Sequence, residues 1–426
     1  MSTRPSSLDY VSAWFVKAGR FAANGGPQIA FVATNSICQG EQVAQLWPLL
    51  FGKFALEISF AHRTFAWPGK AAVHCIIVGL SPRGTEPIEK RLFSYAELKG
   101  NPVETRHNAI TAYLFASGET LRHNVILEHR TAMSAPTAMR MGSKIVDGGH
   151  FIFDASERAQ FVSQEPEGER FLVPLIGSKE FIQGGKRWIL DLQDVAPADL
   201  RNLPLVTERI RRVRKFREAS KKENTRMLAA TPLVFEVNTR PNVSFLVVPE
   251  VSSERRAYIP IGWVETPAVP TNLVQVIEDA TLYDFAILTS AAHMAWLRQV
   301  GGRLESRYRY SIGLVYNTFP WPDATPAQRA KIEALAQAVL DARALPKNAT
   351  STLADLYDPD RMPAELYKAH KALDAAVDKL YAPKGFADDR ARVEHLFRRY
   401  EALVMPTAAA PAANRRTNRR VTRRLK

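Results

Sequence analysis

Three charged side chains alternate along a short segment just before Tyr310: Glu305, Arg307 and Arg309. In an extended strand, alternate side chains point to the same face. An arginine donates two hydrogen bonds to guanine, and a glutamate accepts one from cytosine, so one Glu–Arg pair could read a G·C base pair in the major groove. A cross-strand salt bridge on a wet surface explains the same residues equally well, and the residues alone do not separate the two interpretations.

The densest group of cations lies on a predicted helix that runs from Glu208 to about Leu228. It holds nine basic residues against three acidic ones, with a narrow apolar seam formed by Ile210, Val213 and Phe216. Like charges at this density repel one another unless something screens them. A solvated helix face is the plainer interpretation, but we favour contact with DNA phosphates, which positions a protein without specifying sequence. The residues that we assign to this contact are Arg211, Arg212 and Lys215.

The charge of the whole chain favours the same class of partner. Its 426 residues carry 57 basic and 43 acidic side chains, for a net charge of +14. An excess of this size favours a polyanion, and double-stranded DNA is the first candidate. A charged tail accounts for only part of the excess, because residues 415–426 hold basic side chains and no acidic one. We expect residues 405–426 to be a disordered basic tail.

Several catalytic motifs are absent, and their absence excludes several classes of enzyme. The chain has no glycine-rich dinucleotide or phosphate loop, no nucleophile elbow and no His-Glu-x-x-His. Its histidines do not cluster with acids, and its two cysteines, Cys38 and Cys75, suit neither a disulfide scaffold nor a zinc site. We therefore expect no metal and a reducing, cytoplasmic compartment. The most apolar run, residues 71–80, is too short to cross a membrane, so we expect no membrane partner.

The predicted helices and strands, which must position these residues, follow different patterns in different parts of the chain. Helical patterns occur at 8–22 and 41–51, and strand patterns occur at 29–34, 54–61 and 71–80. This alternation is typical of an α/β sheet, here with only three strands. Residues 81–322 have frequent turn residues and short strand patterns, which indicate an irregular α+β domain. These strand patterns lie at 151–153, 171–176, 233–237, 245–248, 258–261 and 308–316.

Residues 323–404 are predicted to be helical. Thr325-Pro326 followed by Gln328 has the pattern of a capped helix start. A second helix is expected from about residue 363, and a third from about 388 to 403.

Two sets of motifs resemble one family of enzymes. The first set is similar to the later motifs of the amino-methylating DNA methyltransferase domain in MmeI-like restriction–modification enzymes. It comprises LDYV at 8–11 with Trp14, FVATNS at 31–36, QGEQV at 39–43, FAHRTFAW at 60–67 and KAAVHCIIVG at 70–79. The second set resembles the target-recognition domain of the same family and comprises residues 146–149, 177–188, 245–261, 308–311 and 316–322. Together they cover roughly residues 8–404.

The resemblance implies both a fold class and domain boundaries. The class is α/β plus α+β. We expect the C-terminal half of a class I methyltransferase domain at 1–95, with an incomplete Rossmann-like sheet. An α+β target-recognition domain would follow at 96–322, then a C-terminal helical bundle at 323–404 and the tail at 405–426.

The resemblance also implies an activity: site-specific methylation of adenine N6 in DNA with S-adenosylmethionine. Such enzymes hold the cofactor with a glycine-rich loop and the target amino group with an Asn-Pro-Pro-aromatic motif, and neither occurs in this chain. We therefore expect the DNA-recognition part of a truncated or split enzyme, which binds no cofactor alone. The missing amino-terminal methyltransferase half is a candidate partner. A non-catalytic DNA-binding specificity subunit is the alternative, so whether the chain is itself an enzyme stays open.

Several single residues take roles from the resemblance. Related enzymes place an aromatic that stacks on the extruded base where this chain has Phe65, in a predicted turn, with Trp67 as the alternate. Without the resemblance, an aromatic that covers the end of the sheet is the simpler interpretation. Asn35 follows a buried strand, where α/β sheets place ligands, although Asn-Ser is equally good turn chemistry. Asp191 stands where the family has an aromatic. The secondary candidates for DNA contact are Lys179, Gln183, Lys186, Arg187, Arg240, Arg255 and Arg256.

Overall fold

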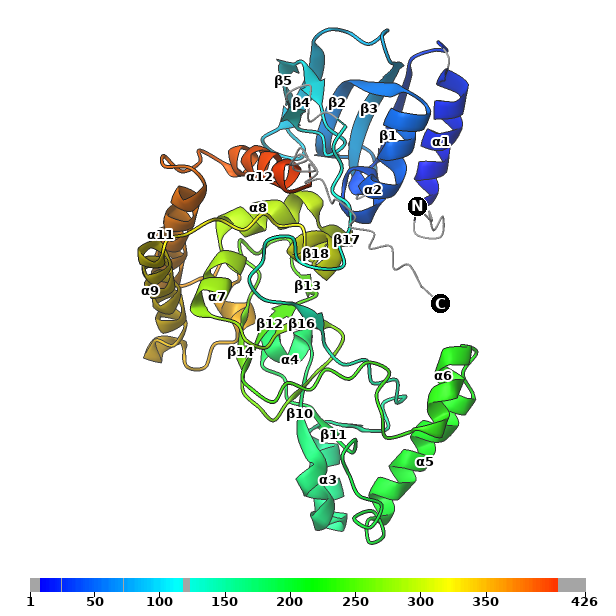
Figure 1. Cartoon of the computed structure of the whole chain (residues 1–426), viewed down its shortest axis with the longest axis vertical. Coiled ribbons are helices and arrows are strands. Elements are labelled where there is room, and N and C mark those ends of the chain that lie inside the picture. Colours follow the sequence, from blue (N-terminus) through cyan, green and yellow to red (C-terminus); the bar gives the residue numbers. More distant parts are fainter. Residues whose placement is uncertain (1–7, 24, 72, 118–122, 405–426) are drawn as a thin grey trace, which may run out of the picture.

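The computed structural model describes residues 8–404 apart from 24, 72 and 118–122. The predicted basic tail lies outside the described residues. Figure 1 shows an elongated molecule with one sheet at the amino-terminal end, helices and small sheets in the middle, and a smaller lobe at the other end. None of the described helices combines the length and apolarity that a membrane crossing requires.

The amino-terminal sheet has five strands in the order β1-β3-β2-β4-β5. They are β1 (Ile29–Thr34), β2 (Leu56–Ala66), β3 (His74–Pro82), β4 (Lys90–Tyr95) and β5 (Pro102–His107). β3 pairs antiparallel with β1 and β2, β4 runs parallel to β2, and β5 pairs antiparallel with β4. The sheet therefore has more strands than the three that we predicted. β4 and β5 carry many charged or exposed side chains, which hide the alternation that marks a half-buried strand.

Helices α1 (Tyr10–Ala22) and α2 (Gly40–Pro48) lie where helical spacing predicted them. α1 buries Phe15 and Ala22 against the sheet. A second apolar stripe on the same helix stays exposed. Its residues are Tyr10, Trp14 and Phe21, which are 81, 50 and 72 % exposed. The spacing of apolar residues thus indicated the helix, but it did not indicate which apolar face is covered.

The middle of the chain forms three small sheets, in the orders β15-β10-β11-β9, β14-β12-β16-β8 and β13-β18-β17, and a two-stranded ribbon of β6 and β7. The bounds are β6 (Ala109–Ile110), β7 (Ala116–Ser117), β8 (Arg140–Met141), β9 (Ile152–Phe153), β10 (Leu172–Ile176), β11 (Trp188–Leu190), β12 (Phe245–Pro249), β13 (Val251–Ser252), β14 (Gly262–Val264), β15 (Val269–Pro270), β16 (Val274–Ile277), β17 (Gly302–Leu304) and β18 (Arg307–Arg309). Short strands in separate sheets agree with a mixed α/β organisation.

Two predicted strands in this region were wrong. Residues 233–237 contribute only an isolated bridge, at Val237, and 258–261 form no strand. Tyr258 is instead buried, and its hydroxyl donates to Asp374 at 2.5 Å. A buried apolar run can therefore be a loop packed in the core as well as a strand. Hydrogen-bond partners from elsewhere in the chain then satisfy its polar groups.

Two predicted elements were too long. Residues 308–316 divide into β18 and the π-helical turn η7 (Ile312–Tyr316), which begins where the Ser311 hydroxyl accepts from the Leu314 N–H. The basic helix is two helices, α5 (Pro204–Glu218) and α6 (Glu223–Met227). With α3 (Ala155–Gln164), α5 forms part of the small lobe (Figure 1).

The carboxy-terminal helices are α9 (Pro326–Arg343), α11 (Ala364–Tyr381) and α12 (Asp389–Val404). α9 begins with the predicted capping box. α9 packs on α11 and on α7 (Leu282–Leu288), whereas α12 packs on α8 (Ala291–Val300). One core extends from Phe15 in α1 to Tyr400 in α12. Among the described residues, these helices therefore share a core with the amino-terminal sheet and with α7 and α8, whereas the small lobe has a core of its own.

Candidate nucleic-acid interface

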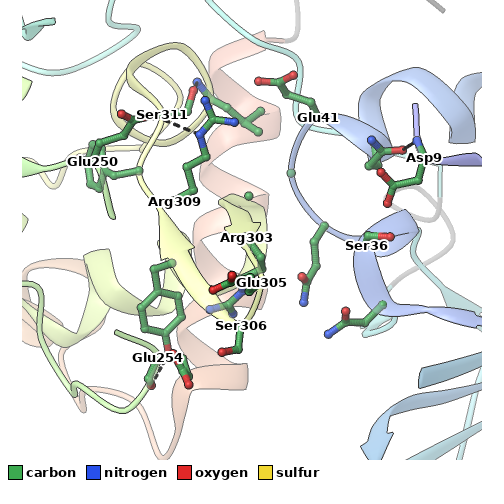
Figure 2. A pocket seen from close by; sticks show the side chains of 18 of the residues that line it. Asp9, Ser36, Glu41, Glu250, Glu254, Arg303, Glu305, Ser306, Arg309 and Ser311 are labelled. Atoms are coloured by element: carbon green, nitrogen blue, oxygen red, sulfur yellow. Dashed lines mark hydrogen bonds and ion pairs between the residues drawn. The ribbon is translucent and has the colours of Figure 1, made fainter. Parts of the chain in front are cut away.

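Two parts of the chain that are distant in sequence line a cavity of about 1320 Å³. One wall comes from the end of β1 and the start of α2, and includes Asn35 and Glu41. The other comes from the β17–β18 hairpin, and includes Glu305 and Arg309. Figure 2 shows the hairpin side chains on one side of this cavity and Ser36 on the other. The fold thus brings three of the predicted site residues, Asn35, Glu305 and Arg309, to one place.

The hairpin presents its charged residues differently from the prediction. Arg307 and Arg309 are exposed on β18 and flank the buried Tyr308, so they share a face as expected. Glu305 is not on that strand. It lies in the turn between β17 and β18, with a φ of 60°. The three residues therefore do not form one alternating row, because the chain reverses direction at Glu305.

The two arginines of β18 each have a carboxylate partner. The Arg307 guanidinium donates to Glu305 at 2.9 Å, and that of Arg309 donates to Glu250 at 3.1 Å. The salt bridge that the alternative interpretation required is thus present. Arg307 and Glu305 are, however, 44 and 77 % exposed, and exposed pairs of this kind contribute only about 0–1 kcal/mol. Such a pair can be exchanged for contacts to a base at small cost.

The end of β1 supplies the polar part of the opposite wall. β1 leads directly into a single turn of 3-10 helix, η2 (Asn35–Cys38). Thr34 and Ser36 join their hydroxyls at 3.0 Å, and Asn35 is half-buried at the cavity. Turn chemistry and a pocket-lining role, which the sequence left equal, are therefore both satisfied by this segment.

Phe65 lies apart from this cavity. It is on β2, opposite Cys75 of β3, and not in the predicted turn, because β2 continues to Ala66. Its ring stacks on Tyr95 with 5.3 Å between centroids, while its neighbour Thr64 lines the cavity. Phe65 therefore does not line this cavity, but Asn35 and Tyr95, the ring on which Phe65 stacks, line a second pocket together.

A histidine fixes the ring on which Phe65 stacks. His62 Nδ1 and the Tyr95 hydroxyl share a hydrogen bond of 2.8 Å. Burial, and then the charge of Arg91, lower the pKa of His62, so the imidazole is neutral at physiological pH. Trp67, the alternate aromatic, is 42 % exposed beyond the end of β2.

The basic side chains of α5 form two groups. The internal group packs inside the small lobe, and the external group is exposed. Arg217 is fully buried, and the Arg209 guanidinium lies 3.8 Å from the centre of the Phe153 ring. Arg211 and Arg212 are exposed, and both donate to Glu208, at 2.7 and 2.9 Å. Arg214 and Lys215 are also exposed. Periodicity placed all of these residues on a helix but did not show that two of the cations are structural.

The secondary candidates for DNA contact are also of two kinds, exposed residues and residues held by protein partners. Three are exposed around α4 (Ser178–Gln183): Lys179, Gln183 and Lys186. The other four are held by protein partners: Arg187 by Glu180 at 2.8 Å, Arg240 by Asp191 and Asp194, Arg255 by Asp360, and Arg256 by Ser252 at 3.5 Å. Asp191 thus has an ionic role here. Burial raises its pKa, and Arg240 opposes that rise.

Sequence reasoning missed Arg303 of β17, which also lines the cavity. Its guanidinium lies 4.1 Å from the centre of the Tyr308 ring, and burial lowers its pKa. It continues the alternation of charged residues by one step toward the amino terminus, which is a signal that could have found it. No cluster of metal-ligating side chains occurs among the residues that the structure describes.

Comparisons with known proteins match nearly all of the chain. The family described as the MmeI DNA-methyltransferase domain matches residues 1–94, the MmeI target recognition domain matches 120–323, and the MmeI C-terminal domain matches 324–407. The chain belongs to the MmeI family. DNA methyltransferase A of Bacillus subtilis (strain 168) is 38% identical over 401 residues, or 93% of this chain. A solved structure of the Type IIL restriction-modification enzyme MmeI in complex with DNA is 41% identical, with a TM-score of 0.85 over 93% of this chain.

The chain is shorter than these MmeI-family relatives. It spans 44% of the length of the Bacillus subtilis protein and 53% of the MmeI chain in the solved structure. The cavity lies where the part matched by the MmeI methyltransferase domain meets the part matched by its target recognition domain.

Two glycines lie close together where these parts of the MmeI-family fold meet. Gly40 begins α2 with a φ of +54°, and a Cβ built there would lie 2.9 Å from the Gly302 Cα. We expect Gly40→Ala to lower the free energy of unfolding by about 1–3 kcal/mol, because a side chain in the left-handed region is strained and would also press on backbone. Urea unfolding measures this change.

Gly302→Ala is the matched control for this contact. A Cβ at residue 302 would lie 3.9 Å from the nearest atom, the Arg309 Cβ, and we expect little or no loss of stability. Equal stability of the two variants would show that the parts do not meet as closely as Gly40 and Gly302 indicate.

Proposed function

We propose that this chain is the DNA-recognition part of a site-specific DNA methyltransferase that methylates adenine N6 with S-adenosylmethionine. The observation that carries the proposal is the cavity shared by the end of β1 and the β17–β18 hairpin. An enzyme that modifies a base must extrude it from the duplex while it still reads the neighbouring bases. Asn35 lies on one wall, and Arg303 and Arg309 lie on the other beside Glu250, Glu254 and Glu305. Arg309 can contact a base once it releases Glu250. The solved structure of the relative MmeI is a complex with DNA, which supports the same partner.

Each site residue has a distinct role in this proposal. Arg307 donates to guanine and Glu305 accepts from cytosine, after they release each other, and Arg309 contacts an adjacent base. Asn35 lines the pocket for the extruded adenine. Phe65 stacks on that base through the face that Tyr95 leaves free.

Phosphate contacts orient the duplex. We assign them to the external cations of α5, Arg211, Arg212 and Lys215, and to the exposed residues around α4. The guanidinium groups of Arg187, Arg240, Arg255 and Arg256 contact the duplex only if they also exchange their present partners.

The described residues do not fit a cradle for S-adenosylmethionine. Such a cradle needs glycines whose missing Cβ leaves room for the ligand. At the cavity, the glycine with positive φ is Gly40, and its missing Cβ makes room for the backbone of Gly302. We therefore derive no methyl-transfer step from this chain. In the complete enzyme, the cofactor site would come from the methyltransferase half that this chain does not span.

The same observation favours a second candidate function. A non-catalytic DNA-binding specificity subunit needs the hairpin and the cations of α5, but no cofactor. The two candidates differ in whether the chain gains activity when the missing methyltransferase half is supplied.

Binding measurements on the purified chain test the proposal. We expect duplex DNA to bind with an affinity that falls as salt rises, with a slope of about −0.9 for each phosphate contact, because bound cations release counterions. Fluorescence anisotropy across a salt series measures this slope. Calorimetry with S-adenosylmethionine should show no heat of binding. A salt-independent DNA affinity would refute the recognition role, and tight cofactor binding would refute the incomplete cofactor site.

A further inference from the structure

A second pocket, of about 340 Å³, lies where the amino-terminal sheet meets α8 and α12 (Figure 1). Its lining includes Asn35, Arg63 and Tyr95, and we call it the Arg63 pocket. Asn35, Gln39 and Thr64 line both this pocket and the larger cavity beside the β17–β18 hairpin. Ligand pockets measure ~300–1,000 Å³, so a pocket of this size suits a single nucleotide and not a duplex. A nucleotide extruded from a duplex in the larger cavity can therefore enter the Arg63 pocket.

Three arginines line the Arg63 pocket, and two of them have a carboxylate partner. The Arg298 guanidinium donates to Asp389 at 2.7 Å, and that of Arg390 donates to Glu394 at 3.0 Å. In the part of the chain that the structure describes, Arg63 has no such partner. A cation that is taken out of water without a counter-ion is costly to a fold. The pocket thus holds one arginine that the chain itself leaves unpaired.

A turn in an unfavourable conformation fixes the Arg63 side chain. The Arg63 Nε donates to the Leu114 carbonyl at 2.7 Å, and the two terminal nitrogens have no hydrogen-bond partner among the described residues. Leu114 has a φ of 57°, in the left-handed region that favours glycine, and strain of this kind is typical of binding sites. Gln299 of α8 holds the same turn, because its amide donates to the Tyr113 carbonyl at 2.9 Å. The side chain is therefore held in place although its charge is unpaired.

The guanidinium stays charged in this setting. Burial, and then the charge of Arg390, lower the pKa of Arg63 to about 10, although Glu394 and Asp388 oppose the change. At physiological pH the pocket therefore offers a fixed cation with free donors, which is the group that phosphate prefers.

We propose that Arg63 binds the DNA phosphate beside the extruded nucleotide, while the other side chains of the pocket receive the base. This inference rests on the proposed function. Gln39 supplies a second group that lacks a partner, since its Oε1 is buried and accepts no hydrogen bond among the described residues. An unpaired cationic donor and an unpaired neutral acceptor match the two ends of an adenine nucleotide, its phosphate and its amino group.

Arg63→Gln removes the charge and keeps the anchor of the side chain. The amide nitrogen of glutamine is as many bonds from the backbone as the Nε of arginine, so it can still donate to Leu114. We expect this variant to unfold in urea at the same concentration as the wild type or a higher one, because an unpaired charge no longer has to leave water. A clear loss of stability would show that Arg63 is structural and would overturn the proposal.

Binding of an extruded base tests the proposal directly. The probe is a duplex in which one adenine stands opposite an abasic position, so that extrusion costs little, and the fully paired duplex of the same sequence is the reference. We expect the chain to bind the probe roughly tenfold more tightly than the reference in fluorescence anisotropy, and Arg63→Gln to lose this preference. Its affinity for the reference should not change, since the exposed cations of α5 remain. Arg390→Gln, which removes another cation of the same pocket, should keep the preference.

An uncharged methylphosphonate in place of one phosphate locates the contact. Placed on each side of the unpaired adenine in turn, it should weaken wild-type binding roughly tenfold at one of the two positions, and Arg63→Gln should not respond to it. If neither position matters, the proposal fails, and displacement of the probe by inorganic phosphate would then identify a free phosphate as the ligand. Equal loss of the preference in Arg390→Gln would mean that the arginines attract DNA only by their charge, which also overturns the proposal. No binding to the reference duplex would refute the proposed function as well, whereas binding without a preference for the probe refutes this inference alone.

Discussion

Replacement of Arg217 by alanine is expected to lower the free energy of unfolding by roughly 3–5 kcal/mol, because several backbone carbonyls lose their donor at about 1–3 kcal/mol each. The guanidinium is fully buried and donates five hydrogen bonds of 2.9–3.1 Å to backbone carbonyls. These carbonyls belong to Ile145, Val146, Leu228, Thr231 and Val234. Without the side chain, the carbonyls of Ile145, Val146 and Val234 lose this donor, whereas those of Leu228 and Thr231 still accept from backbone N–H groups. Urea unfolding, followed by the fluorescence of Trp188 in the same lobe, measures the loss.

Arg217→Lys should recover little of this stability. An ammonium group has three donors at one point and cannot reproduce the planar fork of a guanidinium. Arg214→Ala, one helical turn earlier and exposed, is the matched control. It should leave the unfolding curve unchanged. A stable Arg217→Ala protein with weakened DNA binding would contradict the structural role and would assign Arg217 to phosphate contact instead.

Replacement of Arg307 by alanine is expected to cost roughly 1–3 kcal/mol of discrimination at one base pair, the usual value of a bidentate base contact. Arg307 is held only by the exposed turn residue Glu305 in the free chain, so the DNA-bound state gains more from the guanidinium than the free state does. Affinity for a set of duplexes that differ at single positions measures this loss. The complete enzyme, restored by supply of the missing half in trans, allows the same measurement through methylation.

Arg212→Ala is the contrasting variant for the readout experiment. It should weaken all sequences alike and reduce the salt dependence, because a phosphate contact carries no sequence information. A double variant that exchanges the two residue types, Glu305→Arg with Arg307→Glu, should change the preferred base at one position only. If Arg307→Ala instead weakens every duplex uniformly, then the Glu305–Arg307 salt bridge is merely structural and Glu305 has no part in recognition.

Recognition of the family and of several regular elements required only the sequence. Motifs such as FVATNS at 31–36 predicted the MmeI resemblance, which the comparisons confirm over almost the whole chain. Helices α1, α9 and α11 lie close to their predicted positions, because apolar spacing and capping residues act within a few residues of each other.

The partners of the charged residues depended on tertiary structure. Arg214 and Arg217 lie three residues apart on one helix, yet Arg217 is internal and Arg214 is external. The difference arises because α5 packs on segments more than ten residues away, whose carbonyls meet Arg217 alone. Similarly, Glu305 belongs to a turn because the chain reverses to pair Arg303 with Tyr308 across β17 and β18.

What the sequence determined by itself was therefore local: helix starts, strand-forming segments and the motifs that identify the MmeI family. These depend on residue type and short spacing, which a linear chain displays directly. Only the tertiary structure decided which apolar face of α1 is buried, that Phe65 stacks on Tyr95, and that Asn35 and Arg309 share one cavity. Each of these depends on contacts between segments that the chain brings together only when it folds, and periodicity carries no information about the far partner.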